Sequence, residues 1–267
     1  MDNSKKNTPS KTHKLKCTFV IVSFFIQTLS LPLTLALLLS GWKKRVIHQN
    51  LAHTQLSGRL SFFQYYFHLS CDLVSFLLSI TKKPVQLRQK DLLKFNQFKN
   101  SGGLLLTAHF HNWELMGSWL VSRGLPLKGS ALPLKSSFWN SVLLFLRKKN
   151  TLPTISIGVA RGAYQWIKKG NVFGVLADQR PKAIFVNSSF FGHTVKTTAL
   201  PGFLLQKTAC PVYFLWLTPS FEVRAIRLTT GTTSETLLLK RYHKVLETII
   251  RKHPNYWYGF SHNRFKV

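Results

Sequence analysis

Two histidines and a glutamate stand close together in the stretch TAHFHNWELMG, residues 107–117. Four residues separate His109 from Glu114, and no other histidine in the chain has an acid at this spacing. A carboxylate that binds one imidazole nitrogen fixes the tautomer, so the other nitrogen can remove a proton from a hydroxyl. His109, His111 and Glu114 could instead bind zinc, since imidazole and carboxylate are both zinc ligands. Two packed or solvated histidines are the third interpretation, and spacing alone leaves all three open.

A second polar group follows the apolar run NVFGVLA at residues 171–177. Asp178 and Gln179 come directly after this run, at the same predicted sheet edge as His109, and could shape a substrate site. Asp178 could equally cap a loop or pair with an arginine. Arg161 lies on the helix predicted before the strand; a buried arginine there would bind phosphate or stabilise an oxyanion, and an exposed one would only be solvated.

The elements that must position these residues can be predicted from the apolar pattern. Residues 104–108 are predicted as a strand that starts after two glycines, and a helix is expected from about Asn112 to Gly124. Open α/β folds place active groups between a strand end and the next helix. Runs such as VYFLWL at residues 212–217 lack period-2 alternation, which indicates strands buried on both faces. We therefore expect an α/β fold with a central, mostly parallel sheet flanked by helices.

Three segments are expected from composition. Residues 1–16 are predicted to be a disordered basic arm, and residues 17–42 carry no charge and are long enough to anchor the chain in a membrane. A cleaved signal peptide or a buried core helix are the alternatives for residues 17–42. Residues 43–267 are predicted to be the catalytic domain, with residues 43–83 helical and close to the membrane. A second span within residues 43–83 is disfavoured because Asp72 would be costly in lipid.

The charge of the chain is strongly asymmetric, with 37 Lys and Arg against 8 Asp and Glu and a formal net charge of +29. Such a chain fits anionic partners: nucleic acid, an anionic membrane, or an acidic protein or substrate. The three cysteines are far apart and form no C-x-x-C motif, so neither a disulfide framework nor a cysteine zinc site is expected.

Several blocks together resemble the bacterial lipid A biosynthesis (lauroyl/myristoyl) acyltransferase family, within the glycerolipid acyltransferase-like superfamily that carries a His-x4-Asp/Glu motif. TAHFHNWELMG is similar to the His-Phe-x-Asn-Trp-Glu block of the family, and ARGAYQWIKKGNVFGVLADQRP to its Arg…Lys-x-Gly…Asp-Gln block. FFGHTVKTTALPGFLLQKTACPV is similar to its Phe-Phe-Gly…Thr-Thr…Pro-Val block, and HPNYWYGFSHNRFKV resembles its ending with tryptophan, histidine and arginine. The resemblance covers nearly the whole chain.

This resemblance implies a late acyltransferase that moves an acyl group from an acyl carrier protein thioester to a hydroxyl of a lipid A precursor. It implies an enzyme of the bacterial inner membrane with its catalytic domain facing the cytoplasm, membrane lipids as neighbours, no nucleic acid partner, and no metal or other cofactor. It implies His109 as the base and Glu114 as its orienting partner. The residues expected to bind substrate are Asn112, Arg161, Asp178 and Gln179.

One departure from the family pattern is His111, which stands where the family commonly has glycine. We expect it to cover the rim of the site, with contact to a substrate phosphate as the alternative. The acceptor also stays open, because relatives acylate other membrane glycolipids or aminolipids. Two rivals from other classes remain: a membrane-tethered nucleic-acid binder, which lacks any recognisable binding signature here, and a metallohydrolase built on His109, His111 and Glu114.

Overall fold

The computed structural model describes residues 11–79, 85–130, 136–155, 158–229 and 233–266, and the side chains of residues 11–19 lie outside this description. Residues 1–10 of the expected basic arm are therefore not described. Helix α1 begins at Lys11, so the last residues of that stretch are helical.

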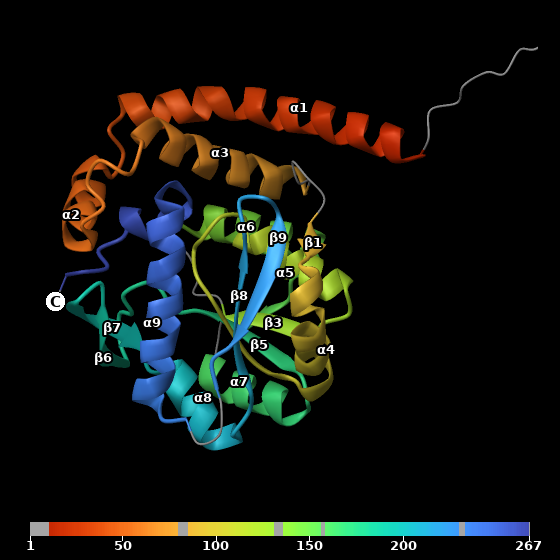
Figure 1. The fold of residues 1–267 in the computed structure, drawn as a ribbon, viewed down its shortest axis with the longest axis vertical. Coiled ribbons are helices and arrows are strands. Elements are labelled where there is room, and N and C mark those ends of the chain that lie inside the picture. The colour runs from red at the N-terminus through yellow and green to blue at the C-terminus, as the bar shows by residue number, and fades with distance from the viewer. Residues whose placement is uncertain (1–10, 80–84, 131–135, 156–157, 230–232, 267) are drawn as a thin grey trace, which may run out of the picture.

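The described part of the chain is built around one seven-stranded sheet (Figure 1). Its strands, in spatial order, are β1 (Gln86–Leu87), β9 (Glu222–Arg227), β8 (Val212–Leu217), β2 (Gly103–Thr107), β5 (Val172–Leu176), β3 (Leu127–Ser130) and β4 (Thr154–Ile155). Neighbouring strands are parallel except β8 and β9, which are antiparallel. This confirms the predicted α/β fold with a mostly parallel sheet.

The glycine pair before the predicted strand has a structural reason. Gly103 opens β2 at φ 132°, and a Cβ at this position would collide with the carbonyl oxygen of Pro211, the residue before β8. Only glycine allows β2 to approach β8 this closely at its first residue. The strand that carries His109 therefore starts where the sequence predicted.

Helices cover both faces of the sheet. Alternate residues of β2 point to opposite sides, so each set packs against a different group of helices. Leu105 packs with residues of α4 (Leu92–Ser101) and α5 (Trp113–Ser122). Leu104 and Leu106 pack with residues of α7 (Val159–Lys168), α8 (Leu200–Thr208) and α9 (Glu235–Lys252). Both strand faces are buried, as the missing alternation indicated.

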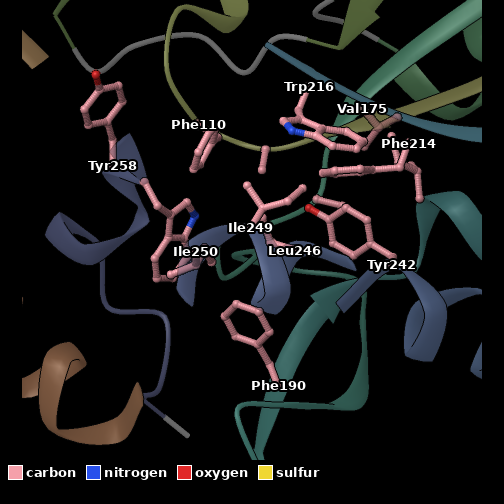
Figure 2. Close-up of a cluster of buried hydrophobic side chains, with 14 of the residues drawn as sticks. Phe110, Val175, Phe190, Phe214, Trp216, Tyr242, Leu246, Ile249, Ile250 and Tyr258 are labelled. Carbon is pink, nitrogen blue, oxygen red and sulfur yellow. The ribbon is translucent and has the colours of Figure 1, made fainter. Parts of the chain in front are cut away.

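The larger core lies between the sheet and α9 (Figure 2). Helix α9 starts at an N-cap, where the Ser234 side chain accepts a hydrogen bond from the Leu237 backbone. Its buried residues recur at helical spacing and are Leu238, Leu239, Tyr242, His243, Leu246, Ile249 and Ile250. Tyr242 also donates its hydroxyl proton to the backbone oxygen of Thr107, 3.0 Å away, and so ties α9 to the end of β2.

Three helices precede the sheet: α1 (Lys11–Leu39), α2 (Lys44–Thr54) and α3 (Phe62–Leu78). Figure 1 shows α1 lying along α3 at one side of the domain. Within α1, Val20–Leu39 is long and apolar enough to cross a membrane by length and composition. The buried residues of this stretch, Ile26, Ser30 and Thr34, recur every four positions and form one face, while most of the others are exposed.

The remaining elements complete the surface around the sheet. Helix α6 (Ser137–Lys149) packs near the end of α3, where Phe76 and Leu146 share a small apolar cluster. Strands β6 (Phe185–Phe190) and β7 (His193–Thr198) form a separate antiparallel hairpin. Short 3-10 helices occupy Gln89–Asp91, Pro254–Tyr256 and Tyr258–Ser261.

Candidate active site

The candidate site forms where β2 and β5 end side by side. These strands pair in parallel, with Thr107 opposite Leu176. His109 follows Thr107 by two residues and Asp178 follows Leu176 by two, so the register of the sheet brings the two side chains together. Both residues lie at the carboxyl edge of the sheet, where the sequence placed them.

Asp178 accepts three hydrogen bonds. Its Oδ1 lies 2.8 Å from Nδ1 of His109, and its Oδ2 accepts from the His109 backbone and from Nε1 of Trp257, both at 2.9 Å. The Asp178 side chain is fully buried, whereas His109 keeps 21% of its side chain exposed. Burial by itself would raise the pKa of Asp178, but the charge of a protonated His109 and these hydrogen bonds outweigh it and lower the pKa to about 2. Asp178 is therefore a carboxylate aimed at one nitrogen of His109.

The other nitrogen of His109 faces Gln179. The amide nitrogen of Gln179 lies 3.2 Å from Nε2 of His109 and 3.1 Å from Nε2 of His262. Because an amide nitrogen donates, both Nε2 atoms accept, and the proton of neutral His109 sits on Nδ1 against Asp178. The outward nitrogen thus carries a lone pair, as a general base requires.

Glu114 differs from its expected place. Its carboxylate binds the guanidinium of Arg147 on α6 through two hydrogen bonds, one of them from Nε at 3.2 Å. Both side chains are about as buried as each other, at 12% exposed. The expected contact between His109 and Glu114 is wrong, because Glu114 points from the first turn of α5 toward α6 and Asp178 occupies Nδ1 of His109.

His111 also differs from its expected place. It is 4% exposed, so the prediction that it covers the rim of the site is wrong. Its Nδ1 lies 3.0 Å from Oδ2 of Asp72 on α3, and the hydroxyl of Tyr258 donates to the same oxygen at 2.6 Å. His111 therefore belongs to a second, buried histidine–carboxylate pair.

The proposed zinc ligands do not converge. His109 faces Asp178, His111 faces Asp72 and Glu114 faces Arg147, so each of the three has a different partner. Among the residues that the structure describes, no three His, Cys, Asp or Glu side chains are grouped so that they could hold a metal ion. The geometry does not support the metallohydrolase alternative.

Two other expected substrate residues occupy contrasting environments. Asn112 is 2% exposed just before α5, and its side-chain nitrogen has no hydrogen-bond partner within the described residues. Arg161 is exposed in the first turn of α7, which follows the edge strand β4. Asn112 lies in the loop that carries His109, whereas Arg161 does not join the His109 network.

A family model described as bacterial lipid A biosynthesis acyltransferase matches residues 78–267. The chain belongs to this family. Comparison with curated proteins gives no match. Family membership makes the chain an acyltransferase of lipid A biosynthesis, with a lipid A precursor as acceptor. The matched region contains His109, Asp178 and their neighbours from the C-terminal segment.

The C-terminal segment supplies site residues of this acyltransferase that sequence reasoning did not place. Beside the Trp257 bond to Asp178, the backbone nitrogen of Tyr258 donates to the carbonyl oxygen of His109 at 2.8 Å. Phe110 and Trp257 form an isolated antiparallel bridge. The resemblance of the tail to the family ending was the available signal, but the motif carries no information on which atoms its residues contact.

An apolar cleft opens beside the pair in this acyltransferase. The empty space in it and in front of it is about 460 Å³, open solvent included. Its lining comes from β2, β3, β4, β5, α5 and α6 and includes Thr107, Trp113, Gly117, Gly129, Gly174 and Leu176. The Trp113 ring centroid lies 5.0 Å from that of His109, and the Glu114–Arg147 pair also borders the cleft. A hydrocarbon chain that contacts Trp113 in this cleft would lie close to His109.

Proposed function

We propose that this chain transfers a fatty acyl group from an acyl carrier protein thioester to a hydroxyl of a lipid A precursor, with His109 as general base. The observation that carries the proposal is the His109–Asp178 pair, with Nδ1 held at 2.8 Å by a buried carboxylate. This arrangement leaves Nε2 as the basic nitrogen at a partly exposed position. Asp178 rather than Glu114 is the orienting partner in this proposal.

The reaction then needs one base and a few hydrogen-bond donors. Nε2 of His109 removes the acceptor hydroxyl proton while the oxygen attacks the thioester carbonyl carbon. Asp178 stabilises the imidazolium that forms. The tetrahedral oxyanion collapses, the carbon–sulfur bond breaks, and the imidazolium returns its proton to the leaving thiolate. The acceptor hydroxyl must displace the Gln179 amide from Nε2.

Direct transfer, without a covalent acyl-enzyme, fits the two cysteines whose side chains are described. Cys71 is fully buried and Cys210 is 8% exposed. Burial raises the pKa of the Cys210 thiol, which disfavours the thiolate that would attack a thioester. A stable acyl adduct trapped on either cysteine would contradict direct transfer.

The donor fits the cleft and the charge of the chain. The apolar cleft suits an acyl chain, and Trp113, which lines it, contacts the His109 ring. Acyl carrier proteins are acidic and lipid A precursors carry phosphates, so a net charge of +29 favours encounter with both. Carrier protein is proposed over coenzyme A because its larger acidic surface matches this charge.

Two features of the helices support a place at the inner membrane, and the cytoplasmic face is what the family resemblance implies. Val20–Leu39 is long and apolar enough to span the bilayer. On α6 the exposed Phe138, Trp139 and Phe145 stand with Lys148 and Lys149, a composition typical of a helix that lies at an anionic membrane surface.

Lipid mass spectrometry tests the proposal most directly. Lipid A from a bacterial host with the protein should carry one acyl chain that is missing without it, and His109→Ala should remove most of this addition. Unchanged lipid A with a new acyl chain on another glycolipid or an aminolipid would support the alternative acceptor. Full activity of His109→Ala would contradict the general-base assignment.

A further inference from the structure

The chain has a second buried histidine–carboxylate pair, which the reaction does not use directly. His111 and Asp72 are 4% and 7% exposed, and their side chains meet at 3.0 Å. Nε2 of His111 is buried and has no hydrogen-bond partner within the described residues, so its side-chain hydrogen bonding runs through Nδ1. His111 does not reach solvent or substrate, and its role must be exerted through its neighbours.

The backbone at His111 indicates that the side chain is needed there. His111 has φ 47°, in the left-handed region, which glycine adopts with less strain than a residue that carries a Cβ. Its backbone nitrogen donates to the Tyr256 carbonyl at 2.8 Å, and its ring packs edge-on against Phe221 and Tyr256. A glycine would adopt this turn with less strain, so the contact with Asp72 offsets an unfavourable backbone.

Asp72 is connected to His109 along two routes. The first runs through His111, two residues along the same loop. The second runs through Tyr258, whose hydroxyl donates to Asp72 at 2.6 Å and whose backbone nitrogen donates to the His109 carbonyl at 2.8 Å. Asp72 therefore holds both the loop and the C-terminal segment that fix the backbone of His109.

We infer that Asp72 and His111 are positioning residues for acyl transfer, which couple the placement of α3 to that of His109. Helix α3 packs along α1, whose Val20–Leu39 stretch is long and apolar enough to cross a membrane (Figure 1). The position of His109 therefore depends on these two helices as well as on the sheet. This inference rests on the proposed role of His109.

The test compares His111→Gly with His111→Asn in the full-length protein in detergent micelles. Glycine suits φ 47° and keeps the loop foldable, but it removes the donor to Asp72. Asparagine tolerates the same φ and places an amide nitrogen close to the position of Nδ1. We expect His111→Gly to lower kcat about tenfold with little change in the KM for acyl donor, and His111→Asn to restore most of kcat.

A matched control separates positioning from stability. Tyr66, also buried on α3, donates its hydroxyl proton to the Trp42 carbonyl at 2.6 Å and belongs to neither route. Tyr66→Phe should lower thermal stability and leave kcat within about twofold. Asp72→Ala combined with His111→Gly should cost no more in kcat than the larger single change, because the two residues act as one unit.

The outcomes distinguish this inference from the proposed function. Wild-type kcat in His111→Gly, additive losses in the double variant, or an equal loss of kcat in Tyr66→Phe would overturn the positioning role. Full activity of His109→Ala would instead overturn the proposed function, whatever the His111 variants show.

Discussion

His109 and Asp178 occupy equivalent positions beyond two paired parallel strands, 69 residues apart in the chain and 2.8 Å apart in space. The register that places Thr107 opposite Leu176 also aligns these two residues. The backbone ladder of the sheet therefore sets where the two loops begin, and the bonds of His109 to Asp178 and Tyr258 fix it within its loop. A base held in this way needs little reorganisation before it accepts a proton.

The identity of the carboxylate partner can be tested with two isosteric changes. Asp178→Asn should lower kcat by roughly 10²–10⁴-fold, because an amide can force the wrong tautomer on His109 and cannot stabilise the imidazolium. Glu114→Gln should lower kcat less than about tenfold, since Glu114 binds Arg147 instead. Steady-state kinetics of both variants, with folding checked by circular dichroism, measures this. A larger loss of kcat in Glu114→Gln than in Asp178→Asn would instead support Glu114 as the partner of His109.

The pH profile of the wild-type enzyme should show a base other than Asp178. The pKa of Asp178 is lowered to about 2, so its carboxylate is present above that pH and is lost only as the pH falls through it. Any fall of kcat/KM with decreasing pH above about pH 4 therefore reports a group other than Asp178. Loss of this acidic limb in the residual activity of His109→Ala would identify His109 as that group, and an unchanged limb in that variant would exclude it.

The local secondary structure around His109 could be predicted from the sequence. Two glycines, an apolar run, a short loop and an amphipathic stretch predicted the strand–loop–helix around His109, and β2 and α5 have nearly those bounds. Local periodicity and turn chemistry determine such elements, so they can be predicted from one sequence. The edge position of Asp178 followed from the same reasoning.

The sequence could not identify the partners, because they depend on packing between distant segments. Glu114 is the acid that stands at the motif spacing from His109. The direction in which its carboxylate points depends on Arg147 of α6, which it binds. Trp257 and Tyr258 return to His109 only after α9 has crossed the sheet face. Asp72 bonds to His111 and Tyr258, which lie 39 and 186 positions away along the chain. Such contacts have no local pattern.

Trp257→Phe should weaken the pair without removing either member. The change deletes the indole donor to Oδ2 of Asp178, one of the causes that lower the pKa of Asp178, so that pKa should rise. We expect the free energy of unfolding to fall by about 2 kcal/mol near neutral pH and kcat to fall about tenfold. Denaturant unfolding and steady-state kinetics measure the two effects.

Trp166→Phe is the control for this change. The Trp166 indole donates to the carbonyl oxygens of Pro126 and Val172, away from His109. It should lower stability by a comparable amount and leave kcat within about twofold. Equal losses of kcat in the two variants would show that the Trp257 effect is only destabilisation.

The last prediction concerns the cleft and the acyl chain. Gly129 lines the cleft on β3, and a Cβ there would meet only a methyl group of Thr154 at 3.8 Å, an ordinary contact. Gly129→Val should therefore be accommodated by the strand while its methyl groups narrow the cleft. If the acyl chain lies there, the rate with the preferred donor, relative to one two carbons shorter, should fall about tenfold or more. Competition between two acyl donors, read by mass spectrometry, measures this ratio, and Gly129→Ala should give a smaller shift in the same direction. An unchanged ratio in both variants, with normal overall activity, would place the acyl chain outside the cleft.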